Sequence, residues 1–213
     1  QRLFLGAQEL RDQDLVLEVT PPASPVADFS ILRADPEWQN CLEMVSIAGM
    51  QLAVAPEALR ADRVLAMAAV RRCGGALQFA AEELRDDRDV VLAAVLDKGM
   101  ALEYASKELQ ADAEVVRTAV AQSGLALQFA AETLRADFEI VLTATLGASQ
   151  AFEYADAELR ADRKAVRQVV EGSGLALEFA SHLLRADREI VLLAVEQDGL
   201  ALEYASEELR RDR

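Results

Sequence analysis

Residues 174–198 read GLALEFASHLLRADREIVLLAVEQD, and this stretch decides the fold because its pattern recurs along most of the chain. A glycine or serine opens each copy, and successive copies begin 25 residues apart without an insertion. Leucine or phenylalanine follows three residues after the opening residue, alanine six residues after it, and aspartate thirteen residues after it. The opening residues are Gly49, Gly74, Gly99, Gly124, Ser149, Gly174 and Gly199. Seven copies in one register predict a repeat protein.

Each copy predicts a pair of helices. Apolar residues at helical spacing predict a first helix over residues 175–185. Asp187 then suits the N-cap position of a second helix over residues 188–197, because its carboxylate can accept from free backbone amides. Gly199 suits the left-handed turn that commonly ends a helix. The unit is therefore a hairpin of two helices of about 10 residues each, well below the ~12–15 residues at which isolated helices become stable.

Hairpins this short must stack on one another, which predicts an all-α fold and, within it, an α-solenoid. With about 8–10 Å between packed helices, seven copies form a rod roughly 60–70 Å long. The aromatic position alternates between phenylalanine and tyrosine, so pairs of hairpins make a true period of 50 residues. We expect the tyrosine hydroxyls to reach one edge of the stack.

The phrases GLALEFA (174–180), LRADREIVL (184–192) and GLALEYAS (199–206), together with the alternation, resemble a tandem helical repeat family. This family is known as domain of unknown function 4116, and the resemblance covers residues 32–213. It implies a repeat unit of about two hairpins. It implies no activity and no catalytic residues. The family occurs widely in algal and protist proteins and in some bacterial effectors.

The pattern divides the chain into four parts. We interpret residues 1–20 as a partial ubiquitin-like segment and residues 21–30 as a proline-rich linker. Residues 31–48 form an irregular capping unit, since terminal copies of solenoids are often atypical. Residues 49–213 are the seven-copy solenoid, whose last copy is incomplete.

The first 19 residues alternate as strands do, and they resemble the later strands of a ubiquitin-like fold. The first hairpin, the helix and the terminal Gly-Gly of that fold are absent. Phe4 and Val16 match two positions of ubiquitin's hydrophobic recognition patch and are therefore candidate interaction residues. The chain opens with Gln1 and stops at Arg213, where a helix should begin, so we expect these residues to belong to a longer polypeptide.

Composition excludes several functions. The 213 residues contain 22 Lys and Arg against 37 Asp and Glu, a net charge of −15, which argues against binding nucleic acid or an anionic membrane surface. No apolar run approaches the roughly 20 residues of a membrane-spanning helix, although peripheral attachment to a membrane complex stays open. Two cysteines and one histidine cannot supply the usual four ligands of a structural zinc site. We expect no metal and no cofactor.

Few side chains suggest chemistry. His182 occupies a helical position that carries glutamate in other copies, so we expect it to be solvated. Neither Cys41 nor Cys73 has an evident basic activator, and both are interpreted as buried or inert thiols. A ladder of arginines, interrupted at Gln110, is expected to meet the acidic surface of neighbouring copies, for instance the aspartate caps, with a phosphate-binding stripe as the less favoured alternative. Its members are Arg60, Arg85, Arg135, Arg160, Arg185 and Arg210. Because we find no candidate catalytic residue, we expect that the protein is not an enzyme.

Three functions remain open. The favoured one is a protein–protein interaction scaffold, an accessory subunit at the periphery of a larger assembly, for example an organellar complex such as a photosynthetic one. The second is an adaptor in ubiquitin-type signalling. The third is the repeat module of a larger enzyme or effector. The partners are then other proteins. The sequence leaves the compartment open, and we expect a soluble intracellular protein of the cytosol or of an organelle interior such as the plastid stroma.

Overall fold

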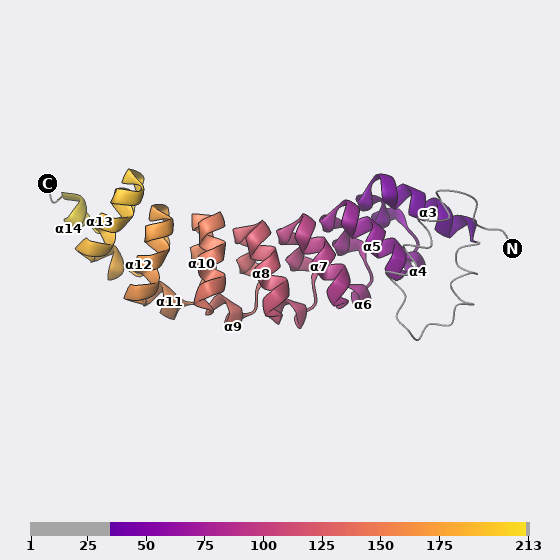
Figure 1. Ribbon diagram of the computed structural model, residues 1–213, viewed down its shortest axis with the longest axis horizontal. Coiled ribbons are helices and arrows are strands. Elements are labelled where there is room, and N and C mark those ends of the chain that lie inside the picture. Colours follow the sequence, from indigo (N-terminus) through magenta and orange to yellow (C-terminus); the bar gives the residue numbers. More distant parts are fainter. Residues whose placement is uncertain (1–34, 212–213) are drawn as a thin grey trace.

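The structure is a computed structural model that describes residues 35–211, and these residues form an elongated stack of helices (Figure 1). No strand occurs among them. The stack begins with α3 (Pro36–Ile47), and a helix of 10 residues then recurs in each copy from the one that opens at Gly49 to the one that opens at Gly174. These long helices are α5 (Arg63–Arg72), α7 (Arg88–Asp97), α8 (Ala113–Gln122), α10 (Phe138–Gly147), α12 (Arg163–Gly172) and α13 (Arg188–Gln197). The prediction of an all-α solenoid is confirmed.

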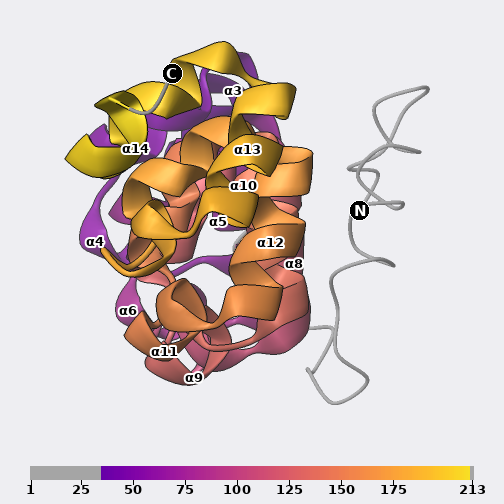
Figure 2. The same ribbon diagram turned by 90° about the vertical axis from the view of Figure 1, so that its left-hand side faces the viewer.

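A second row consists of 3₁₀ helices, one at the start of each copy. They are η1 (Gly49–Val54), η2 (Gly74–Phe79), η3 (Gly99–Tyr104), η5 (Gly124–Phe129), η6 (Ser149–Tyr154), η7 (Gly174–Phe179) and η9 (Gly199–Tyr204). A third row consists of short helical turns. They are α4 (Glu57–Arg60), α6 (Glu82–Arg85), η4 (Leu109–Ala111), α9 (Glu132–Arg135), α11 (Ala157–Ala161), η8 (Leu184–Ala186) and α14 (Glu207–Arg211). Seen along the stack, α4, α6, α9 and α11 lie on one side, and α8 and α12 lie on the other (Figure 2).

The prediction of one helix over residues 175–185 is wrong, because that stretch forms η7, a break and then η8. The backbone of Ala180 is extended, with φ −67° and ψ 157°. The next amide, that of Ser181, donates to the carbonyl of Arg160 in the preceding copy at 2.8 Å. An amide that bonds to a neighbouring copy cannot bond within its own helix, so the helix is interrupted at this corner.

The aspartate caps are confirmed. Asp137 Oδ1 accepts from the backbone N–H groups of Glu139 at 3.0 Å and Ile140 at 3.2 Å, at the start of α10. The carboxylate therefore satisfies two amides that have no partner within the helix. The same cap begins the other long helices, at Asp62, Asp87, Asp112, Asp162 and Asp187.

The opening glycines have a different role from the expected left-handed turn. No described glycine has a left-handed backbone, Gly199 included. A Cβ atom on Gly74 would instead overlap the carbonyl oxygen of Ala94 in the next long helix. Glycine thus allows the opening 3₁₀ helix to approach the long helix of its own copy closely. Ser149 takes this place in one copy and is half-buried, whereas Gly124 is buried.

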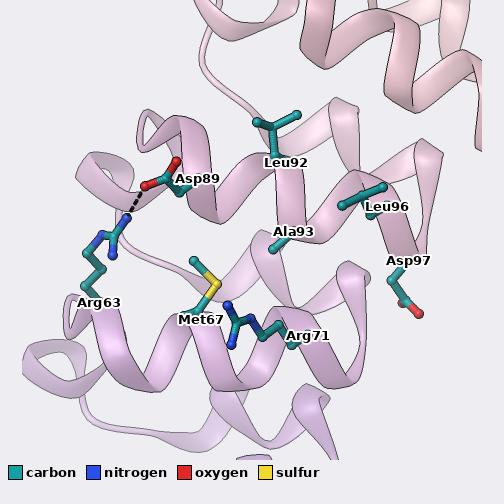
Figure 3. A pocket seen from close by; sticks show the side chains of 8 residues that line it. All are labelled: Arg63, Met67, Arg71, Asp89, Leu92, Ala93, Leu96 and Asp97. Atoms are coloured by element: carbon teal, nitrogen blue, oxygen red, sulfur yellow. Dashed lines mark hydrogen bonds and ion pairs between the residues drawn. The ribbon is translucent and has the colours of Figure 1, made fainter. Parts of the chain in front are cut away.

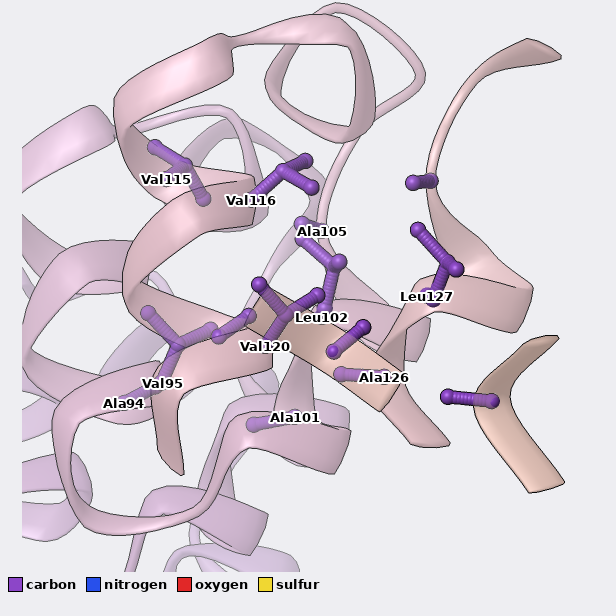
Figure 4. Close-up of a cluster of buried hydrophobic side chains, with 14 of the residues drawn as sticks. Ala94, Val95, Ala101, Leu102, Ala105, Val115, Val116, Val120, Ala126 and Leu127 are labelled. Atoms are coloured by element: carbon purple, nitrogen blue, oxygen red, sulfur yellow. The ribbon is translucent and has the colours of Figure 1, made fainter. Parts of the chain in front are cut away.

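The core lies between the row of long helices and the row of 3₁₀ helices. Figure 4 shows Val116 and Val120 of α8 beside Leu102 of η3 and Leu127 of η5, and these four side chains are at most 1% exposed. Each copy buries its apolar side chains against the copies before and after it. The result is one continuous core along the stack, as expected of a solenoid.

The N-terminal end of the stack is α3. Its Trp38 Nε1–H donates to Asp62 Oδ2 at 3.2 Å and so links α3 to the aspartate cap of α5. Residues 1–34 and 212–213 lie outside the described residues. The ubiquitin-like segment, with Phe4 and Val16, and the proline-rich linker therefore stay predictions.

Candidate functional site

Three hollows follow one another along the row of short turns, each at a junction between copies. The first has a volume of about 600 Å³ and lies between α6 and the corner of the next copy, where Arg85 and Tyr104 line it. The second contains Gln110 and Phe129, and the third contains Arg135 and Tyr154. We call this line of hollows, from Glu82 to Ala157, the arginine groove. It follows the edge of the stack on which α6, α9 and α11 lie (Figure 1).

Backbone hydrogen bonds place each groove arginine beside the next copy. The Ser106 N–H donates to the Arg85 carbonyl at 2.9 Å, and the Asp156 N–H donates to the Arg135 carbonyl at 2.9 Å. Equivalent bonds link Ala81 to Arg60, Ala131 to Gln110, Ser181 to Arg160 and Ser206 to Arg185. This series of backbone hydrogen bonds along the short turns holds each arginine against the aromatic corner of the following copy.

The guanidinium groups of this row have unused donors. The Nε atoms of Arg60, Arg85, Arg135, Arg160 and Arg185 are buried and have no hydrogen-bond partner among the described residues. The side chain of Arg135 remains 32% exposed, and its nearest carboxylate oxygen, on Glu132, lies 3.8 Å away. A buried donor without an acceptor costs about 1–3 kcal/mol, so five of them in register are unfavourable for the isolated chain.

Gln110 shows how the groove differs where arginine is absent. Its side chain is 5% exposed, and Nε2 donates to the carbonyls of Leu102 at 3.0 Å and Glu103 at 3.3 Å. Its Oε1 accepts from Lys107 Nζ at 2.9 Å. The glutamine is therefore satisfied within the fold, and it shows that the backbone of this corner accommodates an uncharged side chain.

The expectation that this arginine ladder meets the aspartate caps is wrong. A different arginine, at the first residue of the long helices, does so: Arg63 Nε lies 2.7 Å from Asp87 Oδ2, and Arg63 Nη2 lies 2.8 Å from Asp89 Oδ2. Arg88 pairs in the same way with Asp112 and Glu114, and Arg163 with Asp187 and Glu189. The hydrogen bond from Arg163 is the main cause that lowers the pKa of Asp187. These pairs join successive long helices and leave the groove arginines on the opposite row.

A separate hollow lies between α5 and α7 on the long-helix side. Figure 3 shows Met67, Leu92 and Leu96 around it, with Arg63 reaching Asp89 at one end. Leu96 is 66% exposed. Because Arg63 and Asp89 form an ion pair that joins α5 to α7, we interpret this hollow as part of the stacking and not as the functional site.

Half-buried aromatic rings complete the arginine groove. Tyr104, Phe129 and Tyr154 each contribute one to a hollow. Burial and the neighbouring carboxylate of Glu103 raise the pKa of Tyr104. The negative charge of Glu178 raises the pKa of Tyr204 at the equivalent position further along. The rings thus stand among carboxylates.

Acidic side chains outnumber basic ones along the groove. The seven carboxylates that line the three hollows belong to Glu82, Glu83, Asp86, Glu103, Glu108, Glu132 and Asp156. The three cations belong to Arg85, Lys107 and Arg135. The balance, 3 − 7 = −4, gives the groove the same sign as the chain, whose net charge is −15.

A comparison with family models gives three tandem matches, over residues 62–110, 112–160 and 162–210. The matching family is described as domain of unknown function (DUF4116). This chain belongs to that family. Each DUF4116 unit contains two hairpins, which confirms the 50-residue period. The match does not extend to the N-terminal segment that resembles ubiquitin, and neither the curated proteins nor the solved structures contain a match.

The DUF4116 boundaries explain the alternation along the groove. Phenylalanine stands in the first hairpin of each unit and tyrosine in the second. Arginine occupies the corner of every first hairpin, at Arg85, Arg135 and Arg185. The second hairpins carry Gln110, Arg160 and Arg210 there. The unusual corner is thus a second-hairpin corner.

The other candidate residues from the sequence do not line the groove. His182 is exposed, as expected. Cys41 is buried, and burial is the main cause that raises the pKa of its thiol, so it stays protonated and unreactive. Within residues 35–211, no group of three or more His, Cys, Asp or Glu side chains could hold a metal ion. No helix in that range is long and apolar enough to cross a membrane.

Proposed function

We propose that this chain is a non-catalytic scaffold that binds another protein along the arginine groove. The observation that carries the proposal is the recurrence of one arrangement at the two junctions on either side of Gln110. In each, a half-buried tyrosine (Tyr104 or Tyr154) lines the same hollow as an arginine (Arg85 or Arg135) whose Nε–H has no partner among the described residues. Solenoids commonly bind other proteins along such extended surfaces. Because these Nε atoms are buried, a partner that supplies hydrogen-bond acceptors would bind instead to the Nη groups of Arg85 and Arg135, which line the groove.

Within this proposal, the chain acts as an accessory subunit at the periphery of a larger assembly. The groove runs past several copies, so a partner that follows it contacts many weak sites at once. Contacts of this kind add up to a stable attachment when they are held on one rigid surface. This supports a structural role in an assembly, in an organelle or elsewhere, over a role in turnover of a small molecule.

Site-specific photocrosslinking tests the proposal. A photoreactive phenylalanine analogue replaces Tyr104 or Tyr154 in the groove, and in a control it replaces Arg117, which is exposed on the long helix α8. In cells that make the protein, we expect the two groove positions to crosslink to the same partner. We expect the control position not to crosslink to that partner. A chain that purifies as a monodisperse monomer, without crosslinks at any of the three positions, would contradict the proposal.

A further inference from the structure

We infer that the partner segment in the arginine groove is an extended basic polypeptide in polyproline II conformation, with a lysine or arginine at every third residue. The inference rests on the proposed function and specifies the chemistry of its partner. Three features support it: the spacing of the junctions, the unused arginine donors and the charge of the groove.

Spacing selects the conformation. Packed helices lie about 8–10 Å apart, so equivalent points of the groove recur at about this interval. A polyproline II helix rises about 3.1 Å per residue with three residues per turn, and it therefore presents every third side chain on one face at intervals of about 9 Å. A β-strand presents every second side chain at intervals of about 6.6 Å and would lose register after one junction.

The arginine donors suit the backbone of such a segment. A polyproline II chain has no internal hydrogen bonds, so its carbonyl oxygens are free acceptors. Arg85 and Arg135 line the groove, and with Nε buried, the two Nη groups of each remain as donors toward a ligand. Hydrogen bonds from a guanidinium to these carbonyls would anchor the main chain at two junctions. The satisfied Gln110 lies between them.

Charge selects the side chains. The first hollow contains Glu82, Glu83, Asp86 and Glu108 against Arg85 and Lys107, so an acidic segment would be repelled there. A lysine side chain that enters such a hollow meets carboxylates and the face of an aromatic ring, both of which attract a cation. The net charge of −15 also favours the approach of a basic partner, most strongly at low salt.

Fluorescence anisotropy with synthetic peptides tests the inference on the full 213-residue chain. The probe is a labelled 15-residue peptide of five Lys-Pro-Pro repeats. One comparison peptide alternates Lys and Pro and so places its charges at every second residue, and another consists of five Glu-Pro-Pro repeats. At low salt we expect Lys-Pro-Pro to bind at least tenfold more tightly than the alternating peptide, and Glu-Pro-Pro not to bind.

Two double variants locate the binding. Arg85→Gln with Arg135→Gln imitates the natural Gln110 corner and should therefore fold, which circular dichroism and urea unfolding would verify. We expect it to weaken Lys-Pro-Pro binding at least tenfold, although it makes the groove more negative. The matched control, Arg117→Gln with Arg167→Gln, removes the same charge from exposed long-helix positions and should not weaken binding.

The remaining outcomes overturn the inference. Equal or tighter binding of the alternating peptide, which carries more lysines, would mean that the spacing of the lysines does not decide the affinity, and preference for Glu-Pro-Pro would refute the assigned charge. If the folded Arg85→Gln/Arg135→Gln variant binds Lys-Pro-Pro with wild-type affinity, the groove arginines do not take part in the interaction. If groove positions crosslink to a partner but the peptide does not bind, the scaffold proposal stands and only the basic polyproline II segment is refuted. If neither crosslinking nor peptide binding is found, both proposals are refuted.

Discussion

The close approach between the opening 3₁₀ helix and the long helix of each copy leads to a sharp prediction at Gly124. A Cβ atom there would overlap the carbonyl oxygen of Ala144 and crowd the amide nitrogen of Ala148, both of which belong to the backbone around the end of α10. Backbone atoms cannot turn away as a flexible side chain can. Gly124→Ala must therefore push α10 outward along the stack.

The magnitude follows from two opposing effects. Overpacking a well-packed site costs about 1–3 kcal/mol, and the upper end applies here because backbone must move. Alanine restricts the unfolded chain and returns about 0.4–1 kcal/mol. We therefore expect Gly124→Ala to lower the free energy of unfolding by about 2 kcal/mol, the difference between these two effects.

Gly199 provides a matched control, because a Cβ atom added there has nothing within 4 Å among the described residues. Gly199→Ala should leave stability unchanged or raise it by up to about 1 kcal/mol. Urea unfolding followed by far-ultraviolet circular dichroism measures both variants. If the two variants differ by less than about 0.5 kcal/mol, close to the usual spread for surface substitutions, then close approach is not the reason for glycine at this position.

Three further predictions concern the cap, the core and the ion pairs. Asp137→Ala removes the cap of α10 and should cost about 1 kcal/mol in urea unfolding, and an unchanged midpoint would argue against the capping role. Leu102→Ala should lower the free energy of unfolding by about 2–5 kcal/mol, because Leu102 is fully buried. Leu202→Ala should lower it clearly less, because Leu202 occupies the equivalent position and is 41% exposed. Equal losses would mean that the last copy is as well packed as the middle ones. Arg163→Gln should lower Tm at pH 7, because Arg163 pairs with the ionised carboxylate of Asp187 and lowers its pKa. The difference in Tm from wild type should shrink as the pH falls below about 4, where that carboxylate becomes protonated. A difference that persists at pH 2.5 would contradict this.

Part of the candidate site could be predicted from the sequence. The 25-residue recurrence identified the arginine ladder, its interruption at Gln110 and the alternation of the aromatic rings. It did not identify what the arginines contact, because the ladder at Arg85 and the helix-starting residues such as Arg88 are both periodic arginines near aspartates. Only the path of the backbone between copies places Arg88 against Asp112 and leaves Arg85 in the groove.

The sequence by itself determined the fold class, the number of copies and the start of each long helix, because apolar periodicity and aspartate caps act over a few neighbouring residues. The tertiary structure alone decided where the first predicted helix breaks. The Ser181 amide bonds to Arg160, 21 residues earlier, and that competing acceptor exists only once the copies have stacked. It also decided the role of Gly74, which depends on the Ala94 carbonyl in the long helix of the same copy. Both contacts join residues 20 or 21 positions apart in the sequence, and no local propensity encodes them.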